Sequence, residues 1–231
     1  QSDSDPSMFS GAAMTSNTSR ENPLAGKLAL ITGGAHPIGH VFAGLLATAG
    51  AKVLLCDFDP LQLEPVVRRI RESGGDAETY LMASEREEIK ISSIPWLMED
   101  NVKINILVNA LSVQFALKTM NSVKGLLGQD AVILNVLKAP DIQSGGTLQT
   151  SLTDLTRSIK NDFADRAVQV FGLSLAADLV DLLEDPQSVS LEELARITIG
   201  LKDLSMYLCG PLAKEINGRV FELKRMVHQG D

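Results

Sequence analysis

The chain has 231 residues, a formal net charge of −8 and a pI near 4.9. Hydrophobic residues make up 45% and charged residues 22%, the balance of an ordinary globular protein, so a wholly disordered chain is excluded. The acidic balance disfavours nucleic acids and anionic membrane surfaces as partners, because like charges repel. Two cysteines, Cys56 and Cys209, supply neither a disulfide framework nor a zinc cluster, and they favour a reducing, cytoplasmic location.

The first 23 residues are polar and rich in serine, and they lack an apolar core. We expect them to form a flexible N-terminal arm, with the stretch before Met8 an expression remnant. A single domain is predicted over residues 24–231. The apolar stretches are all shorter than the about 20 residues that a membrane-spanning helix needs, so no such helix is predicted.

Seven short apolar runs follow one another, and each is typical of a strand buried on both faces. They cover residues 27–32, 53–56, 78–82, 104–108, 131–134, 168–171 and 219–223. Apolar residues at helical spacing lie between most of them, beginning with residues 38–49. This alternation predicts an α/β fold: a Rossmann-like, doubly wound parallel sheet of about seven strands. The segment between the fourth and fifth strands is short.

The turn after the first strand carries the first functional signal, because ligands of doubly wound sheets bind at that position. This turn and four later segments resemble, in the right order, motifs of the short-chain dehydrogenase/reductase (SDR) family. The segments are Thr32–Gly39, Asn105–Ala110, Thr156–Ser158, Glu192–Leu201 and Ile216–Val220. The resemblance covers almost the whole chain after Leu24 and implies an NAD(P)-dependent oxidoreductase fold.

The resemblance places the remnant of a dinucleotide site on five residues: Thr32, Gly33, Gly39, Asp57 and Asn109. An acid at the position of Asp57 accepts hydrogen bonds from ribose hydroxyls and favours NAD over NADP. The alternative interpretation is a solvated turn residue that precedes the second helix.

Three departures from the family pattern affect this site. Pro37 replaces the middle glycine and has no backbone N–H to offer a pyrophosphate. Leu111 replaces a glycine after the fourth strand, and Ser84-Glu85 stand where an aspartate is usual. We therefore expect no bound cofactor, and NAD if there is one.

The family's reaction requires a Tyr, a Lys four residues later and a Ser that polarises the carbonyl. The chain has two tyrosines, Tyr80 and Tyr207, and neither is followed by a lysine at that spacing. The resemblance puts the Ser, Tyr and Lys positions near Lys138, Gly145 and Gln149. Neither a glycine nor an amide can transfer a proton, so we expect no catalytic residue.

Other catalytic constellations are weak. His36 and His40 are four residues apart but have no further ligand nearby, so no metal site is predicted. Residues 172–176 differ at one position from the G-x-S-x-G nucleophile elbow of hydrolases, and the one histidine that follows them is His228.

Two predicted helices carry apolar stripes. The residues are Val113, Ala116, Leu117, Met120, Val123 and Leu127 in one, and Leu152, Leu155, Ile159 and Phe163 in the other. The resemblance implies that these helices pair with a neighbouring subunit.

We interpret the chain as a non-catalytic SDR subunit, a pseudoenzyme that forms a heterotetramer with an active NAD-dependent SDR paralogue. It resembles the degenerate subunit of heteromeric hydroxyacyl-CoA dehydrogenases of anaerobic aromatic degradation. One alternative is an enzyme with rewired, non-redox chemistry on Lys138, Asp141 and Gln149. The other is a regulator that senses NAD.

Overall fold

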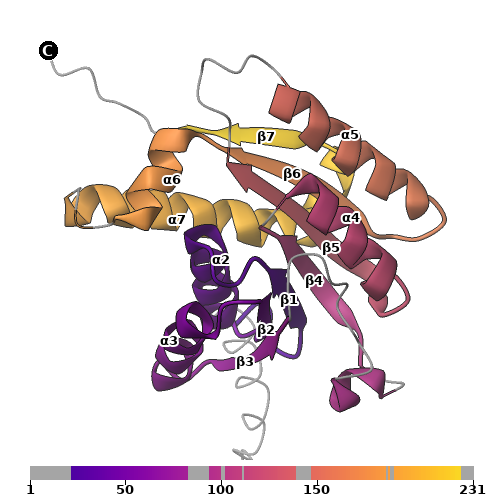
Figure 1. The fold of residues 1–231 in the computed structure, drawn as a ribbon. Coiled ribbons are helices and arrows are strands. Elements are labelled where there is room, and N and C mark those ends of the chain that lie inside the picture. The colour runs from indigo at the N-terminus through magenta and orange to yellow at the C-terminus, as the bar shows by residue number, and fades with distance from the viewer. Residues whose placement is uncertain are drawn as a thin grey trace, which may run out of the picture.

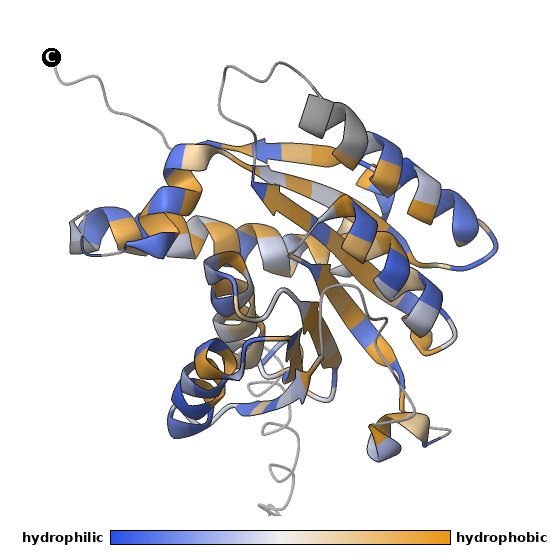
Figure 2. Cartoon of the chain, in the orientation of Figure 1, coloured by the Kyte–Doolittle hydropathy of each residue, from blue (hydrophilic) through white to orange (hydrophobic). Residues whose placement is uncertain are grey.

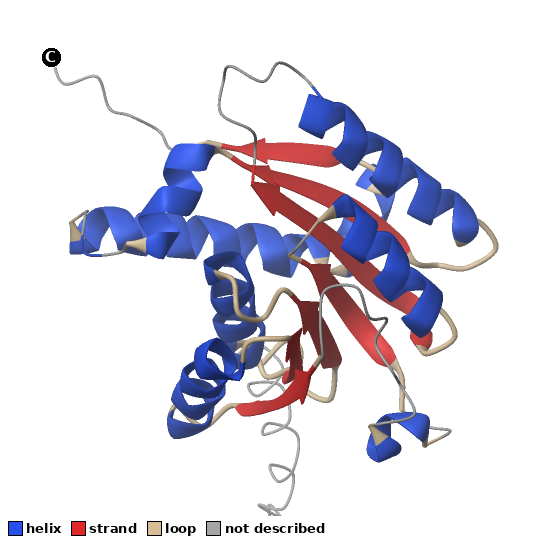
Figure 3. Ribbon diagram, viewed as in Figure 1, coloured by secondary structure: helices blue, strands red, loops and turns tan. Residues whose placement is uncertain are grey.

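The computed structural model describes residues 22–82, 94–99, 102–110, 112–138, 147–185, 187 and 190–224. Seven parallel strands form one sheet in the order β3-β2-β1-β4-β5-β6-β7 (Figures 1 and 3), which confirms the predicted Rossmann-like fold. The strands are β1 Leu28–Thr32, β2 Lys52–Asp57, β3 Asp76–Leu81, β4 Ile104–Asn109, β5 Leu127–Lys138, β6 Gln169–Leu175 and β7 Val220–Leu223.

Helices cover both faces of the sheet (Figure 1). One layer contains α2 Pro37–Thr48, α3 Pro60–Glu72, α6 Ala177–Glu184 and α7 Leu191–Leu208, and the other contains α4 Val113–Val123 and α5 Thr147–Asp162. Two short 3₁₀ helices, η2 Pro95–Met98 and η5 Pro211–Ile216, complete the described elements. Between β4 and β5 the described chain forms the single helix α4.

Alternation along each strand divides the core into two apolar layers. In β1, Ala29 and Ile31 pack toward the α2 side, and Leu28 and Leu30 pack toward the α4 side. Figure 2 shows the resulting pattern, with apolar strands in the middle and helices whose outer faces are polar. A sheet buried on both faces explains why the strands appear in the sequence as continuous apolar runs.

The structure corrects two details of the predicted elements. β5 begins at Leu127, four residues before the predicted start, so Leu127 belongs to this strand and not to the apolar stripe of the preceding helix, which ends at Val123. The exposed Gln129 and Asp130 interrupt the apolar run of the strand. Leu117 was placed on the apolar stripe of α4, but its side chain is 44% exposed. The stripe on α5 is confirmed, since all four of its predicted residues are buried.

Besides the backbone pairing of β6 and β7, the side chain of Asn217 bonds the turn before β7 to the chain at the start of β6. The amide of Asn217 accepts a hydrogen bond from the Val170 N–H at 2.8 Å and donates one to the Val168 carbonyl at 3.1 Å. Lys160 on α5 donates to the Asn217 carbonyl at 2.9 Å. These contacts fix the turn that leads into β7.

Candidate functional site

Glycines in the turn between β1 and α2 meet steric demands of the backbone. Gly33 has φ +76°, a conformation that side chains with a Cβ rarely adopt. A Cβ on Gly39 would lie 2.1 Å from the Gly33 carbonyl oxygen, and one on Gly34 would lie 2.8 Å from Leu63 Cδ2. Close packing within the protein therefore accounts for all three glycines without reference to a ligand.

The first backbone donors of this turn bind acceptors on β2. The Gly34 N–H donates to the Cys56 carbonyl at 3.2 Å, and the Ala35 N–H donates to Asp57 Oδ2 at 2.9 Å. These bonds fasten the turn to the neighbouring strand. They also use N–H groups that, in a dinucleotide-binding turn, are available to phosphate oxygens.

The next donors are used within the turn itself. The His36 N–H donates to the Gly33 carbonyl at 3.0 Å, and Pro37 has no N–H. His36 is the N-cap of α2, and its Nδ1 accepts a hydrogen bond from the Ile38 N–H at 3.2 Å. That bond requires a lone pair on Nδ1, so the imidazole is neutral with its proton on Nε2. From Gly34 to Ile38, every backbone N–H has an acceptor in the chain.

Asp57 lies at the end of β2, as predicted, but it is not a solvated turn residue. Its side chain is 2% exposed, and it accepts hydrogen bonds from the Ala35 and Phe58 N–H groups at 2.9 and 2.7 Å. The cap of α3 is instead Asp59, which accepts from the Leu61 N–H. Both oxygens of Asp57 are thus engaged in holding the turn in place.

Two other predicted site residues belong to a buried polar chain across three adjacent strands. Thr32 Oγ1 lies 3.3 Å from Asn109 Oδ1, and Asn109 Nδ2 donates to Asn135 Oδ1 at 2.9 Å. All three side chains are buried at the carboxyl ends of β1, β4 and β5. Among the described residues Asn135 Nδ2 has no acceptor, and this chain points along the sheet edge where a Rossmann ligand binds.

Lys138 stands at the position that the resemblance gives to the family's serine. Lys138 ends β5, and its Nζ lies 2.7 Å from Asp181 Oδ1 on α6. Gln149 lies on α5, and Gly145, Asp141, Leu111 and Ser84-Glu85 lie outside the described residues.

The two tyrosines lie on other elements. Tyr80 is on β3, the edge strand, and three strands separate it from β5. Tyr207 is on α7 and is exposed. Neither stands near residue 145, the position that the resemblance gives to the family's tyrosine.

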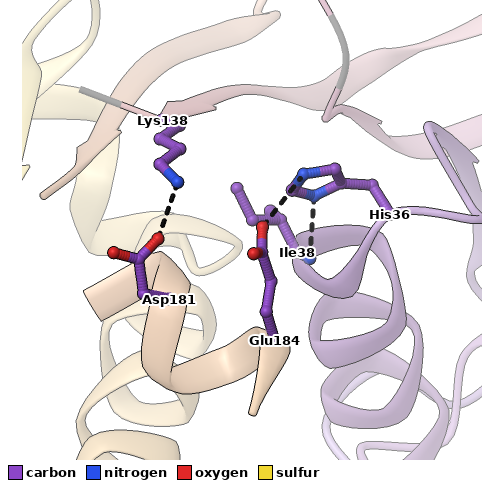
Figure 4. A network of polar contacts seen from close by, with 5 residues as sticks. All are labelled: His36, Ile38, Lys138, Asp181 and Glu184. Carbon is purple, nitrogen blue, oxygen red and sulfur yellow. Dashed lines mark hydrogen bonds and ion pairs between the residues drawn. The ribbon is translucent and has the colours of Figure 1, made fainter. Parts of the chain in front are cut away.

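The sequence analysis missed α6 and its two carboxylates. Glu184 Oε1 lies 3.9 Å from His36 Nε2, so α6 faces both the first turn and the end of β5 (Figure 4). The spacing of Leu179, Leu182 and Leu183 is helical and could have revealed the helix. Asp181 and Glu184, three residues apart, would still have been interpreted as a solvated face.

Burial lowers the pKa of both histidines near the turn. For His36 this effect outweighs Glu184, which favours the protonated form, and Lys138 adds to it. For His40, burial and the nearby Arg69 both lower the pKa. The lowered pKa of His36 agrees with the neutral imidazole that the cap of α2 requires.

The described residues offer no other reactive centre. Burial raises the pKa of the Cys56 thiol strongly and that of Cys209 to about 12, so neither is a thiolate nucleophile at neutral pH. No group of three His, Cys, Asp or Glu side chains among them is placed to hold a metal ion. Ser174, the serine of the elbow-like residues 172–176, is buried inside β6. No helix in this part of the chain is long and apolar enough to cross a membrane.

Comparison with known proteins relates part of the chain to one family. Residues 27–127 match the family model described as short chain dehydrogenase. This match supports the SDR resemblance of the sequence motifs over the part that forms β1 to β4 and α4.

Curated dehydrogenases match part of the chain. A 2,3-dihydro-2,3-dihydroxybenzoate dehydrogenase of Bacillus subtilis is 37% identical over 91 residues, which are 39% of this chain and 34% of that protein. A 2,5-dichloro-2,5-cyclohexadiene-1,4-diol dehydrogenase of Sphingobium indicum is 50% identical over 56 residues, 24% of this chain and 22% of that protein. The chain thus matches about a third or less of the length of these SDR relatives.

Solved SDR structures share the whole fold. A hydroxysteroid dehydrogenase of Escherichia coli has a TM-score of 0.69 at 24% identity, covering 89% of this chain and 98% of that one. An NAD⁺-bound xylitol dehydrogenase has a TM-score of 0.69 at 20% identity, covering 88% and 99%. The xylitol dehydrogenase holds NAD⁺ in its structure, whereas in this chain the turn N–H groups from Gly34 to Ile38 have acceptors within the protein.

Proposed function

We propose that this chain is a non-catalytic SDR subunit that assembles with an active SDR. The turn from Gly34 to Ile38 carries the proposal, because each of its backbone N–H groups already has an acceptor in the chain. A pyrophosphate would have to replace these bonds one for one and would gain little. The sequence adds that no Tyr-x-x-x-Lys is available for hydride-transfer chemistry.

The proposed assembly surface is the outer side of α4 and α5. These helices pack on each other and on one face of the sheet, and Leu117 projects from α4 with 44% of its side chain exposed. An apolar side chain at such a position gains free energy when a neighbouring subunit covers it. The partner we propose is an active, NAD-dependent SDR paralogue in a heterotetramer, with a hydroxyacyl-CoA or related alcohol as that partner's substrate.

The competing function is an active dehydrogenase. It is favoured by the names of the relatives, which are dehydrogenases of small cyclic diols. The two functions make opposite predictions for the isolated chain: the dehydrogenase turns over an alcohol with NAD, and the subunit does not.

The test is purification of the native assembly through a tag on this chain, followed by native mass spectrometry and assay. We expect a complex with a second SDR that contains Tyr-x-x-x-Lys, and hydroxyacyl-CoA oxidation by the complex but not by this chain alone. Leu117→Asp should release that partner. Leu61→Asp, which changes an 82% exposed leucine on α3 in the other layer, should not. Turnover by the pure chain, or a homo-oligomer without a second SDR, would overturn the proposal.

A further inference from the structure

Helix α6 follows β6 directly and packs on the helix that begins at the first turn. β6 ends at Leu175 and α6 begins at Ala177. Its apolar residues Leu179, Val180 and Leu182 are buried in the same layer as α2. Apolar burial therefore holds α6 firmly beside the N-terminus of α2.

The polar side of α6 presents two carboxylates toward the turn after β1 and the end of β5 (Figure 4). In doubly wound folds the ligand crevice lies at this carboxyl edge of the sheet. Asp181 Oδ1 lies 2.7 Å from Lys138 Nζ, and Glu184 Oε1 lies 3.9 Å from His36 Nε2. The two basic residues come from opposite borders of this crevice: His36 from the turn after β1, and Lys138 from the end of β5.

We infer that α6 is an autoinhibitory element at this crevice, whose Asp181 and Glu184 lie against Lys138 and the neutral His36 imidazole, where a phosphate-bearing ligand would otherwise bind. The carboxylates occupy the N-terminal side of α2 with negative charge, where an anionic ligand is otherwise favoured. A ligand would have to displace both carboxylates from their partners or bind against their repulsion. This inference rests on the proposed function, because it explains how the crevice stays closed to a dinucleotide.

Neutralising the two carboxylates tests the inference. In Asp181→Asn/Glu184→Gln the amides keep the shape of the side chains but no longer repel an anion or form an ion pair with Lys138. We expect the dissociation constants of ADP and inorganic pyrophosphate to fall about tenfold, as estimated for two like charges removed from a half-exposed site.

The control removes the same net charge from exposed positions elsewhere. Glu64→Gln/Asp203→Asn changes one residue on α3 and one on α7, both exposed. Its dissociation constants, measured by ligand-observed NMR, should equal those of the wild type. An effect of similar size in both double variants would overturn the inference, because long-range charge alone would then explain it.

The remaining outcomes separate the two proposals. Unchanged affinity in the Asp181/Glu184 variant, with its melting transition intact, overturns the inference and leaves the proposed function standing. Micromolar binding of NAD by the wild type overturns the proposed function itself. Should the double variant not fold, Glu184→Gln alone is measured: about a threefold gain in affinity supports the inference, and none overturns it.

Discussion

Two regions of the same sheet edge differ in what they retain. At the ends of β1, β2 and β4, the turn glycines, Asp57 and Asn109 all keep the places that the family motif gives them. At the end of β5, a lysine paired with α6 stands where the family has its serine. The first region keeps most of its motif residues, although Pro37 replaces the middle glycine of the turn, and the second has lost its serine.

The difference shows that motif residues can be kept for packing alone. Gly39 approaches the Gly33 carbonyl too closely for any side chain, and the Asp57 carboxylate holds the turn through the Ala35 N–H. Neither role needs a dinucleotide. A residue whose only task is to meet substrate has no such second role, so it can change without cost to the fold.

Among the substitutions that test this comparison, Gly39→Ala is expected to lower the free energy of unfolding the most. Gly39→Ala places a Cβ 2.1 Å from a backbone oxygen, so the turn must open, at a cost of about 3 kcal/mol. Gly44→Ala, in the same helix with no atom within 4 Å of the added Cβ, should instead gain up to about 1 kcal/mol. Urea unfolding of the two variants measures both. Equal stabilities would show that the turn is not held by packing.

Asp57 should rank second. Asp57→Ala removes two backbone hydrogen bonds to a buried carboxylate, and we expect a loss of about 2–3 kcal/mol. Asp59→Ala, at the cap of α3, should lose about 1 kcal/mol. The comparison is sharpened by repeating the unfolding in excess NAD: a purely structural role predicts the same difference, whereas a role in cofactor binding predicts a larger one.

The region at the end of β5 should tolerate change. Lys138 and Asp181 form a half-exposed ion pair, which is worth less than about 1 kcal/mol. A double-mutant cycle with Lys138→Ala and Asp181→Ala therefore predicts a small coupling, far below the loss at Gly39. A coupling as large as the Asp57 effect would contradict the contrast between the two regions.

The smallest effect is confined to mildly acidic solution. His36 and His40 have folded-state pKa values below the ordinary 6.5, so the unfolded chain takes up protons first. Their contribution is fully present above that pH and is lost as the pH falls below it. Protonation of His36 Nδ1 also removes the cap on Ile38.

The melting temperature should therefore be lower at pH 5 than at pH 7. His36→Asn, which keeps a capping oxygen but does not titrate, and His40→Leu should each reduce this drop. Thermal unfolding followed by circular dichroism checks this, and a drop unchanged in both variants would assign the acid sensitivity to other groups.

The sequence predicted the sheet well because strands buried on both faces have little freedom in composition. The absence of a Tyr-x-x-x-Lys pair is a matter of the residue inventory alone. The start of β5 could not be predicted, because Gln129 and Asp130 interrupt its apolar run at an exposed strand end.

The polar contacts of the crevice could not be predicted from the sequence. His36–Glu184 and Lys138–Asp181 join residues 148 and 43 positions apart, and only the docking of α6 on α2 brings them together. Leu117 shows the same limit for apolar residues: its spacing fits the stripe of α4, but in the folded chain it stays exposed while Ala116 and Met120 are buried.

The tie between β6 and β7 has a consequence for the order of synthesis. Asn217 satisfies the Val170 N–H and the Val168 carbonyl from 47 and 49 positions further along the chain. While the nascent chain emerges from the ribosome, these groups on β6 are available long before Asn217 exists. During that interval the unfinished sheet presents the open edge of β6, and an unpaired strand edge is prone to pair with other chains until β7 covers it.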